Sequence, residues 1–358
     1  MPHVKIYHAS DRGHFSQIYT GFRRLHRQKV ISLSQTPAEA CALSARLRPT
    51  NPPMLVSIEG RLVVYDLQDG RALCENALDA VDRYFKRGYD PRLVDRLPEA
   101  QRHKVRPLGL NYRVWDDGLD SFALQRALRR RGRQQLTGVI RSLGIDLGFV
   151  PRLSVLKQPP AFAASPKVLF LTRLWDTDRV TVSPGIRSHA EINEMRIACV
   201  AALKAELGGA FIGGVAPDPV AKARCPPALI ADQRVVAKRN YLDLMKATPI
   251  GITSIGLFDS NGGKLGEYVA CSKAIACEPL VHEVPGDFAA GENYLEFTSP
   301  EECVQAAVAL MEDPHLRGRM MLRNFHYYQC YLKPERLVLN TVAEALGISA
   351  VARHDPCS

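Results

Sequence analysis

The chain has 358 residues, 46% of them hydrophobic, which is enough for one large core or two ordinary ones and favours two domains. Its 47 basic and 37 acidic side chains leave a formal net charge of +10, which favours an anionic partner such as nucleic acid, anionic lipid or a phosphorylated small molecule. Its nine cysteines include no Cys-x-x-Cys pair and no zinc-like spacing, so the sequence argues against a disulfide framework and indicates a reducing compartment.

The first residues of the chain predict a strand rather than a targeting segment. Residues 4–9 form a short β-compatible run without the apolar core of a signal peptide. No stretch approaches the roughly 18 apolar residues of a membrane span. We therefore expect a cytoplasmic protein that is soluble or attached peripherally to the inner face of a membrane.

The rest of the first half has the mixed pattern of an α/β domain. Residues 10–14 form a polar turn, and apolar side chains recur at helical spacing over 15–25. Residues 30–33 and 61–67 predict further strands, whereas 73–111 give no clear pattern. Helices and strands are therefore both expected in this half, and residue bounds can be given for only some of them.

Basic side chains concentrate at two places in this half. They are Arg23, Arg24, Arg27 and Lys29 at the first place, and Arg126, Arg129, Arg130, Arg131 and Arg133 at the second. A solvated helix face and an anion-binding face both fit such runs.

The second half shows strands and helices in regular alternation, after a segment whose Pro159, Pro160 and Pro166 are typical of a crossing between domains. The expected strands are 168–171, 210–215, 250–255, 274–277 and 294–297, and the expected helices are 189–207, 234–246, 264–271, 300–311 and others to about 346. This alternation implies parallel pairing in a doubly wound sheet.

We therefore expect an α/β protein with three parts. A Rossmann-like domain occupies residues 1–160, a second one occupies 161–330, and a helix within 331–350 packs back on the first domain. Residues after 350 are expected to form a disordered tail.

Residues 256–270 carry the clearest chemical signal in the chain. A strand ends just before them, at the carboxyl edge of the expected parallel sheet, where open α/β folds place their ligands. Gly262 and Gly263 let the backbone approach a ligand, and a helix that begins near Lys264 offers free amides and a positive dipole end to a phosphate. Glu267, one turn later, can accept hydrogen bonds from sugar or ribose hydroxyls.

A plainer interpretation fits the same spacing. Ser260 or Asn261 can cap an ordinary turn between the strand and the helix, with Lys264 and Glu267 both in solvent. Spacing alone does not choose between the two.

Residues 264–275 resemble the donor-site signature of GT-B glycosyltransferases of the family-four type, in which a helical Glu precedes an Ala-rich turn and a strand. The likeness continues in parts of 283–302, covers about residues 166–335, and is specific between 250 and 300. It implies two Rossmann-like domains that face a central cleft, with an acceptor domain first and a nucleotide-sugar donor domain second.

Carried over residue by residue, the resemblance implies that Glu267 binds the donor's ribose and that Lys264 and Arg173 bind its diphosphate. The remaining donor-binding residues expected in this segment are Ser260, Gly262 and Gly263.

The sequence departs from the family pattern at two points. The family usually has a second Glu eight positions before the ribose-binding one, and Asp259 stands there, with a shorter reach to the donor sugar. The family's companion Lys after the Arg is not evident, and Arg179 and Arg187 are the candidates to replace it.

The loop after the first strand supplies the expected site residues of the N-terminal domain. Gly13 would permit a close approach of donor phosphate or acceptor, and His14 would orient an acceptor hydroxyl or steady the reacting sugar. A histidine at a helix start without any such role fits equally well. Asp11 is the one nearby candidate for a general base.

The resemblance implies transfer of a sugar from a nucleotide-diphosphate donor to a glycan or lipid-linked acceptor, as in polysaccharide biosynthesis. It also implies retention of configuration without a metal or other cofactor. Arg173, Lys264 and the helix N-terminus would stabilise the departing diphosphate. A basic face of the N-terminal domain would contact anionic membrane, where a lipid-linked acceptor lies.

Three other interpretations remain open. Asp176 and Asp178 form a DxD sequence, which metal-dependent glycosyltransferases use to hold Mn²⁺ or Mg²⁺. A non-catalytic binder of nucleic acid or acidic polysaccharide would use the arginines near Arg129, although no nucleic-acid module is recognisable. A dinucleotide-dependent dehydrogenase would need Gly-x-Gly-x-x-Gly after the first strand of either half, and the sequence has none.

Overall fold

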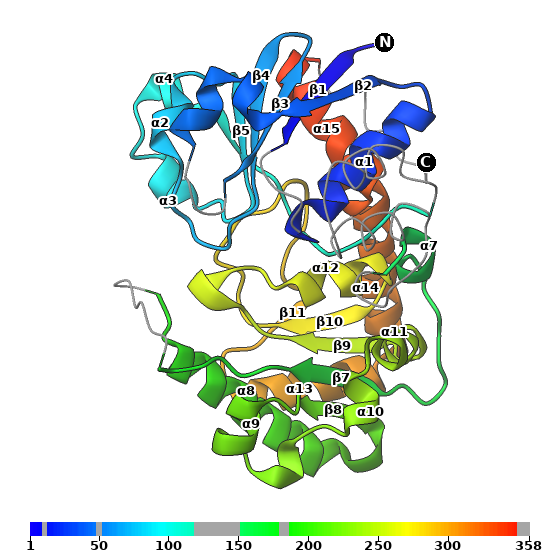
Figure 1. Cartoon of the computed structure of the whole chain (residues 1–358). Coiled ribbons are helices and arrows are strands. Elements are labelled where there is room, and N and C mark those ends of the chain that lie inside the picture. Colours follow the sequence, from blue (N-terminus) through cyan, green and yellow to red (C-terminus); the bar gives the residue numbers. More distant parts are fainter. Residues whose placement is uncertain (9–12, 48–51, 118–150, 179–185, 349–358) are drawn as a thin grey trace, which may run out of the picture. The chain divides into compact units, whose positions relative to one another are not determined.

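The chain forms two compact α/β units, each built around one sheet (Figure 1). The computed structural model describes residues 1–8, 13–47, 52–117, 151–178 and 186–348. The N-terminal unit combines residues 1–155 with 330–358, and the C-terminal unit comprises residues 156–329. The predicted α/β class is confirmed, while the predicted disordered tail lies outside the described residues.

The sheet of the N-terminal unit has six strands in the order β2-β1-β3-β4-β5-β6. They are β1 (His3–His8), β2 (Ser32–Pro37), β3 (Met54–Ile58), β4 (Arg61–Asp66), β5 (Arg83–Lys86) and β6 (Val105–Pro107). Strand β3 runs antiparallel to β1 and β4, and the other neighbouring pairs are parallel. Glu59 and Gly60, both with positive φ, make the two-residue turn that joins β3 to β4.

Helices cover this sheet and complete its core. They are α1 (Ser16–Arg27), α2 (Glu75–Leu78), α3 (Pro91–Val94), α4 (Glu99–Arg102), α7 (Leu153–Leu156) and α15 (Pro334–Leu346). Leu337 and Val338 of α15 join Phe22 of α1 in the core beneath the sheet. The two helices approach closely at Gly21, where a Cβ atom would lie 2.2 Å from the carbonyl oxygen of Pro334.

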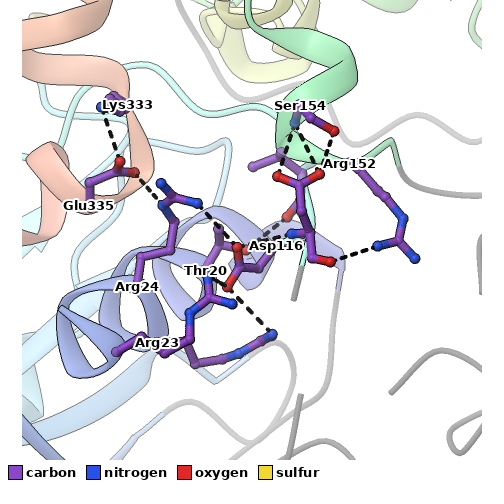
Figure 2. Close-up of polar contacts among 11 residues, drawn as sticks. Thr20, Arg23, Arg24, Asp116, Arg152, Ser154, Lys333 and Glu335 are labelled. Atoms are coloured by element: carbon purple, nitrogen blue, oxygen red, sulfur yellow. Dashed lines mark hydrogen bonds and ion pairs between the residues drawn. The ribbon is translucent and has the colours of Figure 1, made fainter. Parts of the chain in front are cut away.

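Several basic side chains of α1 are engaged inside this unit (Figure 2). Arg23, Arg24 and Arg27 place guanidinium nitrogens 3.9, 3.3 and 2.5 Å from the carboxylate of Asp116, whose side chain is almost fully buried. Arg24 also pairs with Glu335 at 3.1 Å. The three arginines of the first basic run are therefore held in intramolecular ion pairs, whereas its Lys29 is exposed, and the second run lies outside the described residues.

The sheet of the C-terminal unit is parallel throughout, in the order β11-β10-β9-β7-β8. Its strands are β7 (Val168–Thr172), β8 (Phe211–Val215), β9 (Ile250–Thr253), β10 (Ala274–Cys277) and β11 (Leu295–Glu296). These bounds lie close to the expected ones, so the predicted doubly wound sheet is confirmed. Strands β7, β9 and β10 are almost wholly apolar and buried, as strands covered on both faces must be.

The helices of this unit are α8 (His189–Leu207), α9 (Pro219–Arg224), α10 (Gln233–Val236), α11 (Lys238–Ala247), α12 (Gly263–Ala270), α13 (Pro300–Glu312) and α14 (Pro314–Tyr327). Helix α8 packs on α13, and α12 packs on α14. The prediction of a single helix over 234–246 was wrong: the non-helical backbone of Ala237, with φ of −55° and ψ of 126°, separates α10 from α11. This break starts α11 at Lys238, whose amine reaches α12.

The order of the strands places a topological switch point between β7 and β9. From β7 the chain moves outward to β8 on one side, then returns to β9 on the other side of β7. In open α/β sheets, ligands bind outside the carboxyl ends of the strands at such a point. Among the described residues, no helix has the length and apolar character that crossing a bilayer requires.

Candidate functional site

One buried guanidinium links the two strand ends at the switch point. The Nε atom of Arg196, on α8, donates to Ser254 Oγ at 2.8 Å, and its Nη2 donates to the carbonyl of Ile255 at 2.9 Å, both just after β9. Its Nη1 donates at 2.6 Å to the carbonyl of Arg173, just after β7. Burial lowers the pKa of Arg196 to about 10, so it stays charged at neutral pH and fixes both strand ends.

A tightly closed loop follows β9. The amide of Gly256 donates to the carbonyl of Ser260 at 2.8 Å, and the amide of Ser260 donates to the carbonyl of Leu257 at 3.1 Å. Phe258 and Asp259 between them both have left-handed backbone conformations, with φ of 58° and 56°. Strain of this kind in non-glycine residues concentrates at functional sites. The loop turns Phe258 outward and leaves Asp259 and Ser260 buried.

Helix α12 begins at the end of this loop without a side-chain cap. Gly262 is the N-cap residue and makes no side-chain cap hydrogen bond. Asn261 instead donates to the carbonyl of His282 at 2.9 Å, and Ser260 does not cap the helix. The N-cap position is thus held by Gly262 rather than by Ser260 or Asn261, the capping residues that the sequence also allowed. The first amides and the positive dipole end of α12 lie beside the carboxyl end of β9.

A glycine in β9 lets α12 pack closely against the sheet. At Gly251 a Cβ atom would lie 2.7 Å from the ring of Tyr268, which is fully buried on α12. Any larger residue would push the helix outward, so Gly251 sets the distance between the strand end and the helix start.

Lys264, in the first turn of α12, lies over an aromatic ring. Its Nζ atom is 4.1 Å from the ring centroid of Tyr241, which α11 supplies. The side chain is half-buried, and its pKa is lowered to about 8, chiefly by desolvation. Glu267 opposes this shift, whereas the nearby charges of Lys238, Arg173 and Arg196 add to it. The amine is thus a cation with an incomplete set of counter-charges.

Glu267 lies one turn further along α12 and is held from α11. Its Oε1 accepts from Lys238 Nζ and its Oε2 from Tyr241 Oη, each at 3.2 Å. Only 12% of its side chain is exposed. A carboxylate has about four acceptor positions, so Glu267 keeps room for hydrogen bonds from two further hydroxyl groups.

Arg187 and Glu278 form a second ion pair near the same strand ends. Arg187 Nη1 lies 2.6 Å from Glu278 Oε1, and Glu278 Oε2 accepts from the amide of Ile255 at 3.0 Å. The Nη2 atom of Arg187 is buried and has no hydrogen-bond partner among the described residues. Arg187, one of the two candidates for the missing Lys of the family pattern, is thus anchored beside the loop after β9, while Arg179 lies outside the described residues.

The structure thus gathers seven expected residues in the C-terminal unit, around the ends of β7 and β9. They are Arg173, Asp259, Ser260, Gly262, Gly263, Lys264 and Glu267. Arg196, Lys238 and Tyr241 were not among the site residues expected from the sequence. The only signal for the last two was their three-residue spacing, which places both on one helix face.

The expected residues of the N-terminal unit follow β1. The carbonyl of Gly13 accepts from Ser16 Oγ at 2.7 Å, which fixes the short turn before α1. His14 is exposed, and its Nε2 atom lies 3.4 Å from Arg113 Nη2. Asp11, the candidate general base, lies outside the described residues.

The DxD sequence forms a local turn after β7. Asp176 Oδ1 accepts from the amide of Asp178 at 3.1 Å. Asp178 is exposed and pairs with Arg224 at 3.1 Å. Within the described ranges, no group of three or more His, Cys, Asp or Glu side chains is placed to hold a metal ion. Both carboxylates therefore have protein partners in this arrangement.

Comparison with known proteins gives likenesses to solved structures alone. No protein-family model matches the chain, and no curated protein matches it. A glycosyltransferase from Rickettsia africae is 10% identical, with a TM-score of 0.41, over 96% of this chain and 84% of that one. The complex of S. aureus MnaA with UDP is 11% identical, with a TM-score of 0.41, over 94% and 95%.

A third structure resembles part of the chain. The C-terminal domain of a glycosyl transferase group 1 family protein from Francisella tularensis is 14% identical, with a TM-score of 0.32, over 49% of this chain and 95% of that domain. The solved structures that the chain resembles thus include glycosyltransferases. At TM-scores this low, these likenesses do not assign the chain to a family.

Proposed function

We propose that the C-terminal unit binds a nucleoside-diphosphate sugar at the carboxyl ends of β7 and β9, and that the chain is a glycosyltransferase. One observation carries the proposal: an uncapped helix N-terminus stands at the switch point with Lys264 in its first turn and Glu267 one turn later. Amides and an ammonium group suit a diphosphate, and a carboxylate with free acceptor positions suits a ribose.

The positive charges support a role in stabilising the leaving diphosphate. The pKa of Lys264 is lowered chiefly by desolvation, and the charges of Arg173 and the buried Arg196 are close enough to lower it further. Charges that are already in place where negative charge develops lower the barrier without reorganisation. In this proposal they take the role of a metal ion, and transfer proceeds with retention of configuration to a glycan or lipid-linked acceptor.

Ligand binding is the first test. A thermal-shift screen against UDP, GDP, ADP and their sugars should give a rise in melting temperature with at least one of them, since a ligand of the native state stabilises by mass action. Glu267→Gln and Lys264→Met should each reduce that affinity by about tenfold or more. Glu206→Gln and Lys222→Met, at exposed positions of the same unit, are the matched controls.

Full affinity in both site variants, or no shift with any nucleotide, would show that the site assignment is wrong. Transfer is then tested by incubating the best donor with extracted lipids and oligosaccharides, with and without EDTA. We expect acceptor-dependent release of the nucleoside diphosphate that EDTA does not abolish. An isomerised nucleotide sugar, with no release, would refute transfer while leaving the binding site in place.

A further inference from the structure

Tyr241 touches both charged residues of the proposed donor site. Its hydroxyl donates to Glu267 at 3.2 Å, and its ring lies 4.1 Å beneath the ammonium group of Lys264. The residue is 4% exposed and comes from α11, which precedes β9. One buried side chain thus makes contact with a carboxylate and with a cation that lie one turn apart on α12.

The hydroxyl acts on the carboxylate. Because Oε2 accepts from Tyr241 and Oε1 from Lys238, the plane of the Glu267 carboxylate is fixed from the α11 side. Its remaining acceptor positions then have one orientation, which two adjacent hydroxyl groups can use together. Burial raises the pKa of Tyr241 well above its usual value, so the hydroxyl keeps its proton and remains a donor.

The ring acts on the amine. An ammonium group above the face of a tyrosine ring gains a cation–π attraction that leaves its N–H donors on the far side available. Lys238 Nζ also lies near this ring, 5.5 Å from its centroid. The ring therefore supports Lys264 without consuming a hydrogen bond that a phosphate oxygen needs.

We propose that Tyr241 is a positioning residue for a ribonucleoside diphosphate: its hydroxyl orients Glu267 toward the ribose, and its ring holds Lys264 toward the diphosphate. This inference rests on the proposed function and deepens it, because it separates the ribose contact from the phosphate contact within one side chain.

The test compares two ligands on the full-length protein by calorimetry. They are inorganic pyrophosphate and whichever of UDP, GDP and ADP binds best. The 2′-deoxy form of that nucleotide is a further probe. Tyr241→Phe keeps the ring and removes the hydroxyl, so it should lower the affinity for the ribonucleotide by about tenfold and leave pyrophosphate within about twofold. The preference of this variant for the ribonucleotide over the 2′-deoxyribonucleotide should fall as well.

Tyr241→Leu removes the ring as well, and should weaken both ligands. Tyr294→Phe is the matched control, because Tyr294 is also buried in this unit and its hydroxyl donates to Glu296 at 3.2 Å. It should bind both ligands as the wild type does. Retained pyrophosphate binding shows that Tyr241→Phe is folded, and a merely structural role of the hydroxyl would weaken both ligands together in this variant.

Two sets of variants distinguish a wrong donor site from a wrong role for Tyr241. If Glu267→Gln and Lys264→Met bind the nucleotide normally, the assignment of the donor site is wrong, and the role of Tyr241 is refuted as well. If these variants lose affinity but Tyr241→Phe keeps full ribonucleotide affinity and selectivity, the donor site stands and the role of Tyr241 is refuted.

Discussion

The Nζ atom of Lys264 lies 4.1 Å from the centroid of the Tyr241 ring, and its pKa is lowered to about 8. Desolvation is the main cause of that shift. An anionic ligand would supply the counter-charge that the ligand-free protein lacks, so binding and protonation of this amine are coupled.

Affinity for a nucleoside diphosphate should therefore fall as the pH rises through about 8. The ammonium form binds the diphosphate, and the free protein loses that form as its pKa is passed, while the bound diphosphate raises the pKa in the complex. Calorimetry between pH 7 and pH 10 should show a decline that approaches about tenfold per pH unit, with proton uptake on binding. Lys264→Arg stays charged and should lose this dependence; a wild-type affinity that is constant over the range would contradict the coupling.

Lys264→Met should raise the melting temperature of the ligand-free protein. The pKa of Lys264 is lower in the folded protein than in the unfolded chain, so the unfolded chain binds the proton more strongly. The charged lysine therefore costs stability below about pH 8, and the cost disappears as the pH rises toward 10.5. The rise in melting temperature should be present at pH 7 and absent at high pH. Lys222→Met should leave the melting temperature unchanged at both pH values. An equal or lower melting temperature at pH 7 would mean that the desolvation is weaker than the structure indicates.

The sequence predicted the C-terminal sheet and the start of α12 because both depend on local signals. Helix α12 begins at Gly263, one residue from the expected start, since the paired glycines and the following apolar spacing mark it. Strand β3 was missed because Met54–Ile58 is a short buried run whose turn, Glu59-Gly60, is not a strong hairpin dipeptide. The antiparallel strand in the first sheet was therefore not expected.

The partners of the site residues could not be predicted in the same way. Arg196 lies inside a long helix, and its acceptors are 23 to 59 residues away in sequence. No spacing rule distinguishes such a buried arginine from one on a solvated helix face. Likewise, Lys238 meets Glu267 only because the backbone breaks at Ala237 and the parallel sheet brings α11 beside α12.

Asp116→Ala should destabilise the N-terminal unit by about 3 kcal/mol, because it leaves three arginines of α1 without their shared carboxylate (Figure 2). Urea unfolding followed by the fluorescence of Trp115, in a Trp175→Phe background, reports on this unit, since the chain has two tryptophans. Asp95→Asn, at an exposed position of the same unit, is the control. A midpoint equal to that of the control would show that water stabilises the three arginines as well as Asp116 does.

Gly21→Ala should also destabilise the N-terminal unit, although alanine is the better helix former. The added Cβ would lie 2.2 Å from the carbonyl oxygen of Pro334 and 2.4 Å from Val338, so α1 and α15 would have to separate. A gain in helix propensity of about 1 kcal/mol opposes an overpacking cost of about 1–3 kcal/mol, and a clash with backbone favours the upper part of that range. Gly13→Ala, in the same unit, would bring its Cβ only into ordinary contact with the Arg113 side chain, at 3.5 Å, and is the control. The same Trp115 fluorescence should give an earlier midpoint for Gly21→Ala alone, and a later one would mean that α15 can move aside without loss of its core contacts.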